Sequence, residues 1–283
     1  MARNRSAGWQ YAKVSGHENE NLVLSQTDWN DFLRRANIQD TVEEVGVGGI
    51  HERGVKSVLG DVTKSKTDIW IITTKQQRIN VSIKKSRSGQ VFLIGVDRFI
   101  QGYEKQFTCT IPSIVKEAIN LFWGSDRAKI CEALFHNEQI QAYEGRTQKI
   151  RLYEERKCRL VAKTLEAYSR AHSEGLLQWF RENIYNITLF CFSTGLATET
   201  SNHANIIWYI NLLEEDDIDE VFLVDKIAEQ SQNIAKKGGD SIQYGSSLGG
   251  TTIQLPWGFV QWHKGQMQFH HQLDKIRELA SVV

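Results

Sequence analysis

The sequence predicts an α/β fold, and three observations lead to this prediction. Two neighbouring segments, 68–74 and 78–84, have the composition of β-strands and are separated by a short polar turn. The stretch 147–196 carries apolar residues at roughly helical spacing. A third alternating segment, 258–271, predicts a β-hairpin near the end of the chain.

The overall composition is that of an ordinary globular protein. The 283 residues are 41% hydrophobic and 24% charged, which is enough to form one large domain or two modest ones. No apolar run is long enough to span a bilayer, and the first six residues lack the apolar core of a signal peptide, so we expect a cytoplasmic protein without membrane contact. The four cysteines are widely spaced and form no CxxC pair, which predicts reduced thiols and disfavours a zinc site or a disulfide framework.

The charge balance limits the partners that the chain can have. Lysine and arginine together number 34, as do aspartate and glutamate, so the formal net charge is zero. This disfavours general coating of nucleic acid, which requires a basic surface. A local basic surface remains compatible with zero net charge, because charges of opposite sign can be segregated on the folded protein.

The first hairpin places an acid and a lysine close together. Segment 68–74 begins with Asp68 and continues as an apolar, β-branched strand, and segment 78–84 alternates strictly between apolar and polar residues. Residues two apart share one face of a strand, so Ser82 and Lys84 lie side by side. We expect Asp68 to reach the same face from the neighbouring strand.

This arrangement suits hydrolysis of a phosphodiester with Mg²⁺. Mg²⁺ prefers oxygen ligands and keeps several waters, so one or two carboxylates together with the substrate phosphate hold it. We predict that Asp68 is the main ligand, together with the backbone carbonyl of Ile83. We expect Lys84 to orient the attacking water and to offset negative charge that develops in the transition state. Ser82 is not a charged ligand, so a second acid must come from elsewhere.

The N-terminal segment contains the candidate for this second acid. Ser15-Gly16-His17-Glu18 has the pattern of a capping box and precedes apolar residues at helical spacing, which predicts that a helix begins there. Glu18 would then serve as part of the cap. Glu20 is not needed for the cap, and we predict that it is either the second metal ligand or a residue that contacts the metal ligands.

The order Glu20, Asp68, Ser82-Ile83-Lys84 resembles the PD-(D/E)xK nuclease superfamily, which includes many type II restriction endonucleases. The resemblance covers about residues 10–125. It implies a restriction-endonuclease-like core, with a mixed central sheet flanked by helices. Two positions depart from the family pattern: Thr67 replaces a proline that is often absent, and Ser82 replaces the usual acid, so the second acid would be drawn from the helix.

We therefore expect a single domain over residues 1–283. The catalytic core would occupy about 10–125, and added helices and a C-terminal β-hairpin for recognition and dimerisation would occupy about 126–283. The alternative is that Asp68 merely starts a strand and that Lys84 is an exposed strand lysine, as such residues commonly are.

Other elements follow in order along the chain. Gly89 is predicted to turn the chain into a third strand at 90–94. A helix is predicted from Ile111-Pro112 to about Gly124, and another from Arg127 to about 141. The helical stretch 147–196 is most simply a packed scaffold, although its basic residues could form a phosphate-contacting face; these are Arg146, Lys149, Arg151, Arg156, Lys157 and Arg159. A strand is predicted at 206–212.

The C-terminal hairpin is a candidate base-reading element. If Lys264-Gly265 forms its turn, the apolar side chains sort onto one face and the amides and histidines onto the other. Glutamine can bond two edges of adenine, and a two-stranded ribbon fits the major groove. The candidate DNA-contacting residues are Gln261, His263, Gln266 and Gln268, with Arg151 and Arg156 from the preceding helices. An equally open alternative is that this face is simply solvated, and the histidines have no companion ligands that would support zinc.

Together these features predict a Mg²⁺-dependent, site-specific endodeoxyribonuclease that acts on double-stranded DNA. The resemblance implies a type II restriction enzyme of a restriction-modification system, and a homodimer, because a twofold protein matches a palindromic site. Two alternatives stay open: a phage or mobile-element nuclease for repair or recombination, and a catalytically inactive DNA-binding module in which Ser82 marks the loss of activity.

Overall fold

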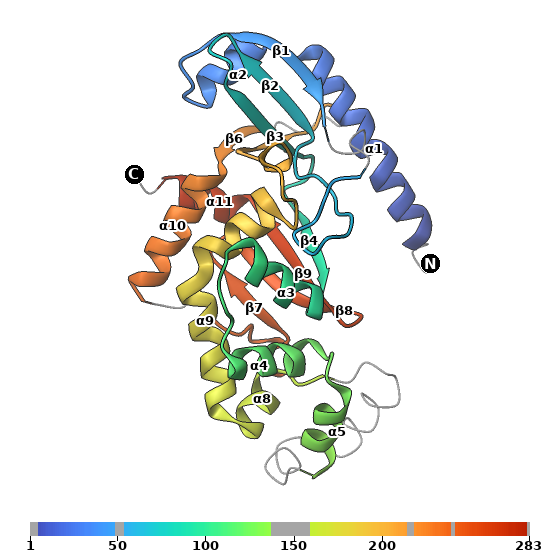
Figure 1. Cartoon of the computed structure of the whole chain (residues 1–283), viewed down its shortest axis with the longest axis vertical. Helices are drawn as coiled ribbons and strands as arrows, with labels where there is room; N and C mark the ends of the chain where they lie inside the picture. The colour runs from blue at the N-terminus through green and yellow to red at the C-terminus, as the bar shows by residue number, and fades with distance from the viewer. Residues whose placement is uncertain (1–4, 49–53, 137–158, 214–217, 239–240, 282–283) are drawn as a thin grey trace. The chain divides into compact units, whose positions relative to one another are not determined.

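The computed structural model describes residues 5–48, 54–136, 159–213, 218–238 and 241–281 (Figure 1). The chain forms two compact units. Unit 1 comprises Met1–Arg87 and Phe192–Ile227, and unit 2 comprises Ser88–Cys191 and Ala228–Val283. The chain therefore passes three times between the units, and the expectation of one domain stays a prediction.

Unit 1 is built on a five-stranded sheet with the order β1-β2-β3-β5-β6. The β3–β5 pair is parallel and the other pairs are antiparallel, so the sheet is mixed. Helices cover it, and the predicted α/β class with a mixed sheet flanked by helices is confirmed. The strands are β1 (Val42–Val47), β2 (Ile69–Thr73), β3 (Arg78–Lys84), β5 (Ile206–Ile210) and β6 (Asp219–Leu223).

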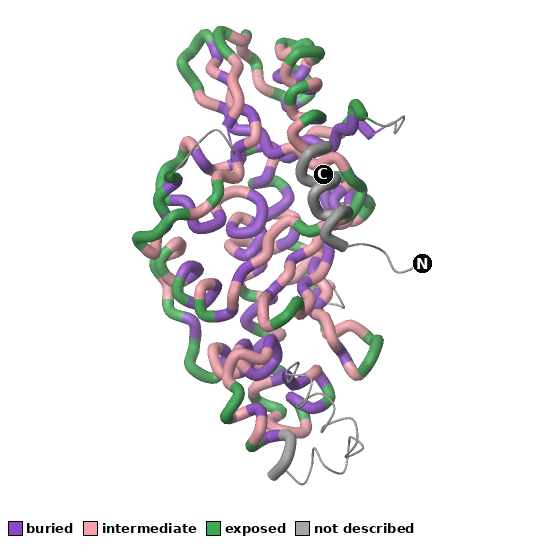
Figure 2. The backbone as a smooth tube through the Cα atoms, turned by 90° about the vertical axis from the view of Figure 1, so that its right-hand side faces the viewer, coloured by how far each residue is buried: buried purple, intermediate pink, exposed green. Residues whose placement is uncertain are grey.

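The predicted hairpin is present as β2 and β3. Ile69 pairs with Val81 and Ile71 with Ile79, and all four side chains are buried. The polar face of β3 is also protected, since Asn80 donates to the carbonyls of Thr200 and His203. β3 is an inner strand of the sheet, which explains why both of its faces are covered. Figure 2 marks such buried segments in purple.

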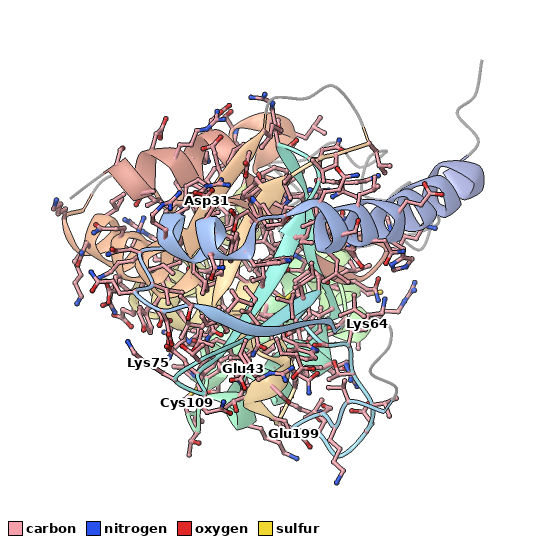
Figure 3. All side chains as sticks on the ribbon, turned by 90° about the horizontal axis from the view of Figure 1, so that it is seen from above. Asp31, Glu43, Lys64, Lys75, Cys109 and Glu199 are labelled. Atoms are coloured by element: carbon pink, nitrogen blue, oxygen red, sulfur yellow. The ribbon has the colours of Figure 1, made fainter. Side chains whose placement is uncertain are left out.

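Two helices cover the apolar face of this sheet, and their boundaries differ from the prediction. α1 spans Arg5–Gln26 and α2 spans Trp29–Arg35. Asp28 begins α2, because its carboxylate accepts from the backbone N–H groups of Asn30 and Asp31, at 3.0 and 3.1 Å. Asp31, in the first turn of α2, is labelled in Figure 3. Ser15 lies inside α1, so the predicted capping box is wrong, and Glu18 is an exposed helix residue that caps nothing.

Unit 2 contains an antiparallel four-stranded sheet with the order β4-β9-β8-β7. Gly89 lies inside β4, so the turn predicted there is wrong. The strands are β4 (Ser88–Gly95), β7 (Thr252–Leu255), β8 (Gly258–His263) and β9 (Gln266–Gln272). The helices are α3 (Val96–Gln106), α4 (Ser113–Trp123), α5 (Arg127–His136), α8 (Ala162–Tyr168), α9 (Arg170–Leu189), α10 (Val224–Lys236, which begins in unit 1) and α11 (Leu273–Ser281). Short 3₁₀ or π turns lie at Phe190–Thr194, Thr200–Asn202 and Ser247–Gly249.

The register predicted for the C-terminal hairpin is confirmed. Gln261 pairs with Gln268, and Trp262 with Met267. Lys264 and Gly265 form the turn, both with positive φ, at 50° and 80°. Two left-handed residues in succession match the right-handed twist of the strands, which accounts for a turn of two residues.

An aromatic core lies on one face of the unit 2 sheet. The ring centroids of Phe99 in α3 and Phe269 in β9 lie 5.9 Å apart. Those of Phe92 in β4 and Phe190, which follows α9, lie 5.3 Å apart. α3 was not predicted, but the helix predicted from Pro112 is confirmed as α4, which ends at Gly124 with φ 74°. The left-handed conformation at this position favours glycine.

The basic stretch before α8 was predicted as a phosphate-contacting face. Arg146, Lys149, Arg151, Arg156 and Lys157 lie outside the described residues. Arg159 is described, and its assignment to that face is wrong, because its side chain is buried and donates to the carbonyls of Phe122 and Thr251. The apolar spacing after it forms α8 and α9, as predicted. Among the described helices, none is long and apolar enough to cross a membrane.

Candidate active site

The β2–β3 hairpin brings Asp68, Ser82 and Lys84 together on one face of the unit 1 sheet. The Ser82 hydroxyl donates to Asp68 Oδ2 at 3.1 Å. Lys84 Nζ donates to Ser82 Oγ at 2.5 Å and to the Ile83 carbonyl at 3.2 Å. Ser82 is buried and Lys84 is half-buried, so the three groups form a continuous chain in a partly desolvated place.

The Asp68 carboxylate is held on one of its two oxygens. Oδ2 accepts from the Ser82 hydroxyl and also from the Ile83 backbone N–H at 2.7 Å. Oδ1 accepts no hydrogen bond from the residues that the structure describes. One oxygen therefore orients the carboxylate, and the other stays available to a ligand. Ser82 links Asp68 to Lys84 through its hydroxyl.

Glu20 approaches this group from helix α1, at the edge where two parallel strands end. β3 ends at Lys84 and β5 ends at Ile210, and parallel strands place their carboxyl ends at one edge of the sheet. The fully buried Asn19 ties α1 to that edge: its amide donates to the Ile210 carbonyl at 2.9 Å and accepts from the Leu212 N–H at 2.7 Å. Glu20, the next residue, is thereby held near Asp68.

Burial and neighbouring charges shift the pKa values of Glu20 and Lys84. The pKa of Glu20 is raised from 4.5 to about 7, chiefly by burial and next by the negative charge of Asp68, against the opposing effects of His17 and Lys84. Burial also lowers the pKa of Lys84, while Asp68 and Glu20 oppose this change. The carboxylates of Asp68 and Glu20 are therefore close enough to repel each other, and the positive charge of Lys84 partly offsets this repulsion.

His17 is a site residue that the sequence analysis did not predict. Its Nδ1 lies 3.3 Å from Glu20 Oε2. Its Nε2 is buried and has no hydrogen-bond partner in the described part of the chain. The spacing of three residues between His17 and Glu20 on a helix was the available signal, because residues three apart are neighbours on a helix surface. The capping-box pattern at Ser15 hides this signal, because it predicts that the helix only begins there, whereas α1 begins at Arg5.

Asn19 provides a test of how Glu20 is positioned. Asn19→Ala leaves the Ile210 carbonyl and the Leu212 N–H without their partner, and we expect it to lower the free energy of unfolding by about 1–3 kcal/mol. We expect denaturant unfolding to show this loss and the activity proposed below to fall as well, because α1 carries Glu20. Asn21→Ala is the matched control, since Asn21 is exposed on the same helix and should change neither quantity. Unchanged stability of Asn19→Ala would contradict the anchoring role.

The donor set suits a hard divalent cation. Among the described residues there is no group of three or more His, Cys, Asp or Glu side chains that could enclose a metal. Asp68 and Glu20 supply carboxylate oxygens, and the Ile83 carbonyl lies beside them. Burial, and next the charge of Asp68, raise the pKa of Glu20, and a bound divalent cation would offset both effects by stabilising the ionised carboxylate. Two carboxylates are sufficient for Mg²⁺, which retains waters.

The predicted DNA-contacting residues of the hairpin lie on one face of the unit 2 sheet. Gln261 and Gln268 are cross-strand partners, and the Gln261 amide donates to Gln268 Oε1 at 2.9 Å. His263 and Gln266 are paired beside the turn, where His263 is exposed. His270 is half-buried and His271 is buried, and they point to opposite faces of β9. These two histidines therefore cannot bind one ion together. Arg151 and Arg156 lie outside the described residues.

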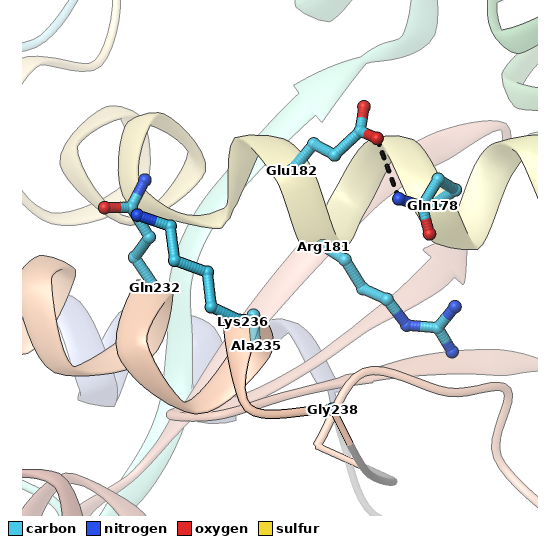
Figure 4. Close-up of a pocket in the computed structure, with 7 residues that line it drawn as sticks. All are labelled: Gln178, Arg181, Glu182, Gln232, Ala235, Lys236 and Gly238. Atoms are coloured by element: carbon cyan, nitrogen blue, oxygen red, sulfur yellow. Dashed lines mark hydrogen bonds between the residues drawn. The ribbon is translucent and has the colours of Figure 1, made fainter.

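A surface pocket in unit 2 offers no comparable chemistry. It is lined from α9 by Gln178, Arg181 and Glu182, and from α10 and the residues after it by Gln232, Ala235, Lys236 and Gly238 (Figure 4). The Glu182 carboxylate accepts from Gln178 at 2.7 Å, and Arg181 donates to the Ile242 carbonyl at 3.0 Å. Glu182 and Arg181 are thus engaged in local bonds, and Glu182 is the one carboxylate that lines this pocket.

The similarity of this chain to known proteins lies in its backbone fold. No family model matches the chain, and no curated protein matches it. Among solved structures, the crystal structure of the restriction endonuclease MspI in complex with its cognate DNA is similar, with 16% sequence identity and a TM-score of 0.41. The similarity covers 84% of this chain and 75% of that one. At this identity and TM-score, the similarity assigns neither an activity nor a substrate to the chain.

Proposed function

We propose that this chain is a metal-dependent endodeoxyribonuclease with a PD-(D/E)xK-like active site in which Ser82 replaces the usual acid. One observation carries the proposal: Asp68, Ser82 and Lys84 form a hydrogen-bonded chain, and beside it burial, followed by the charge of Asp68, raises the pKa of Glu20 to about 7. Paired carboxylates beside a half-buried lysine suit phosphodiester hydrolysis, which must neutralise phosphoryl charge and activate a water.

Each residue has a distinct part in the proposed reaction. Lys84 orients the attacking water and stabilises negative charge on the phosphoryl oxygens. Ser82 holds Lys84 and Asp68 in register through its hydroxyl. Asp68 and Glu20 present oxygens to the cation, and the Ile83 carbonyl completes the protein ligands. His17 contacts Glu20 and helps to keep its carboxylate turned toward the site.

Mg²⁺ is the cation that we propose for this site. When bound, it supplies charge neutralisation at the phosphate and lowers the pKa of a bound water. The chain's own residues hold the oxygen donors in place, and partial burial around Lys84 strengthens the electrostatic effect of each charge.

We further propose double-stranded DNA as the substrate, cut at a specific sequence by a homodimer, as a type II restriction enzyme cuts. The amide face of the C-terminal hairpin supports specificity, because glutamine side chains read base edges. The same chemistry would serve a repair or recombination nuclease, and the pattern of cleavage separates the two: discrete fragments indicate a fixed site, whereas cleavage that follows DNA structure indicates repair or recombination.

The test is cleavage of plasmid and phage DNA by the purified protein. We expect discrete fragments with Mg²⁺ and none with EDTA, because the carboxylate pair requires a cation to engage phosphate. Sequencing of the fragment ends would identify the site. Cleavage that persists in EDTA would contradict the proposed metal dependence, and absence of cleavage on every DNA would contradict the nuclease.

An inactive DNA-binding module is the second candidate, and the position of Ser82 favours it. Ser82 is neutral and fills the place of an acid, so the site has one carboxylate fewer than the family pattern. DNA binding without Mg²⁺-dependent cleavage would identify this module. Ser82→Asp then becomes informative, because restoring the acid should restore activity if only this ligand is missing.

A further inference from the structure

The outer face of the unit 2 sheet is rich in amides and free of carboxylates. None of its strands, β4, β7, β8 and β9, contains an aspartate or a glutamate. The opposite face carries the aromatic core, through Phe92 and Phe269. In a chain with 34 acidic residues, a sheet face that carries none presents no repulsion to a polyanion.

Three glutamines on three adjacent strands are connected across this face. Gln261 of β8 donates to Gln268 Oε1 of β9 at 2.9 Å, and Gln268 Nε2 donates to Gln90 Oε1 of β4 at 2.7 Å. Gln261 Nε2 also lies 3.0 Å from His270 Nε2, and the His270 ring stacks on Phe259 with centroids 4.7 Å apart. Burial lowers the pKa of His270, which favours the neutral ring that this acceptor role requires. These hydrogen bonds connect Gln90, Gln268, Gln261 and His270 in a relay, which determines which way each amide points.

A β-bulge brings Gln90 to this face. The register of β4 against β9 shifts between Gln90, which pairs with His270, and Phe92, which pairs with Phe269. In a regular strand these two residues would share a face, and Gln90 would point into the aromatic core. The extra residue, Val91, turns Gln90 outward, while the half-buried Phe92 keeps its ring contact with Phe190. Bulges commonly re-aim a side chain in this way.

The hydrogen-bonding capacity that remains differs among the three amides. Gln261 uses both N–H groups in the relay, so only its oxygen is left to accept. Gln268 keeps one N–H and one lone pair, and Gln90 keeps both N–H groups and one lone pair. A bidentate contact to adenine requires one donor and one acceptor, for N7 and N6 respectively. Gln268 and Gln90 meet this requirement, and Gln261 can only accept from an exocyclic amino group.

We propose that Gln90, Gln268 and Gln261 form one base-reading surface for duplex DNA, in which Gln90 and Gln268 each select an adenine in the major groove. This inference rests on the proposed function for its substrate class. It extends recognition beyond the hairpin to β4 and identifies Gln90 as a specificity-determining residue.

The test is selection of bound sequences from a pool of random duplex DNA, with EDTA present so that binding is separated from cleavage. We expect the wild type to enrich a motif that contains adenine. Gln90→Ala should lose discrimination at one base pair by about 10- to 100-fold, as expected when a bidentate contact is removed, and should keep the rest of the motif. Gln101→Ala is the matched control, because Gln101 is exposed on α3, the helix that packs through Phe99 on the opposite face of the sheet.

A second variant keeps the proposal testable if alanine disturbs the sheet. Gln90→Glu retains the oxygen that accepts from Gln268 and removes the N–H groups. We expect it to change the preferred base at that position from adenine to cytosine, since a carboxylate accepts from cytosine N4, and to weaken binding overall. An unchanged motif in both Gln90 variants would overturn the role of Gln90, as would a fall in stability without a change in motif, which would identify the relay as purely structural.

The outcome also separates this inference from the proposed nuclease. A wild-type motif without Mg²⁺-dependent cleavage would overturn the nuclease and leave the reading surface standing. Cleavage without any enriched motif would overturn the reading surface and leave the nuclease standing.

Discussion

Replacement of Lys84 by alanine is expected to lower the rate of DNA cleavage by about a thousand-fold or more. Lys84 interacts electrostatically with both Asp68 and Glu20, and its ammonium is oriented by Ser82 and the Ile83 carbonyl. Loss of one group that stabilises transition-state charge, or of a positioned proton donor or acceptor, typically costs between a hundred- and ten-thousand-fold. Single-turnover cleavage at saturating protein measures this loss without the contribution of binding.

Lys75→Ala is the control for this variant. Lys75 lies on the turn of the same hairpin, is exposed, and donates to the Gln39 carbonyl, away from the acids (Figure 3). We expect it to cleave at the wild-type rate. Lys84→Ala should keep its DNA affinity, because the remaining basic residues and the reading surface are intact. Wild-type cleavage by Lys84→Ala would remove Lys84 from the active site.

Replacement of Glu20 by glutamine is expected to stabilise the metal-free protein at pH 8 and to lower its activity. The pKa of Glu20 is raised to about 7, chiefly by burial and next by the charge of Asp68, so its ionised form is disfavoured in the fold. The shift from 4.5 to about 7 corresponds to a cost of up to about 3 kcal/mol. Glutamine resembles the protonated acid in shape and carries no charge, so this variant avoids the cost.

The pH dependence gives this prediction its sign. A group with a raised pKa in the folded state contributes stability that is fully present below its unfolded pKa and is lost as pH rises through the folded pKa. The wild type should therefore lose stability between about pH 4.5 and 7 relative to Glu20→Gln. We expect the gain in the variant to be small at pH 5 and close to its full size at pH 8, as measured by urea unfolding in EDTA.

Glu18→Gln controls for the loss of a charge from the same helix. Glu18 is exposed on α1, and we expect the stability of this variant to differ little from the wild type at either pH. A Glu20→Gln variant that is less stable than the wild type at pH 8 would contradict the proximity of the two acids. Adding Mg²⁺ should reverse the order, because the cation stabilises the wild type through the ionised pair.

Local patterns carried much of the fold. The alternation in β3 correctly predicted that Ile79 and Val81 are buried and that Ser82 and Lys84 share the other face. The register of the C-terminal hairpin also followed from its pattern, as did the end of α4 at Gly124. In each case neighbouring residues decide the outcome: strand side chains alternate, a two-residue turn sets the pairing, and glycine tolerates a positive φ.

The start of α1 shows how such patterns mislead. Ser15 to Glu18 matches a capping box, yet the helix runs from Arg5 to Gln26 without a break there. The same residue pattern also occurs inside a helix, so it marks a helix start only where the residues before it are not helical. The actual break lies at Asp28, whose carboxylate caps α2.

By itself, the sequence determined the β2–β3 hairpin, the shared face of Ser82 and Lys84 and the pairing of the hairpin glutamines, because these depend on residues close together in the chain. Only the tertiary structure decided that Glu20 faces Asp68, since Asn19 is anchored to Ile210, 191 residues away. It likewise decided that a bulge turns Gln90 toward Gln268, because a bulge depends on which strand lies opposite. Contacts between distant segments follow from packing of the whole chain, and no local periodicity encodes them.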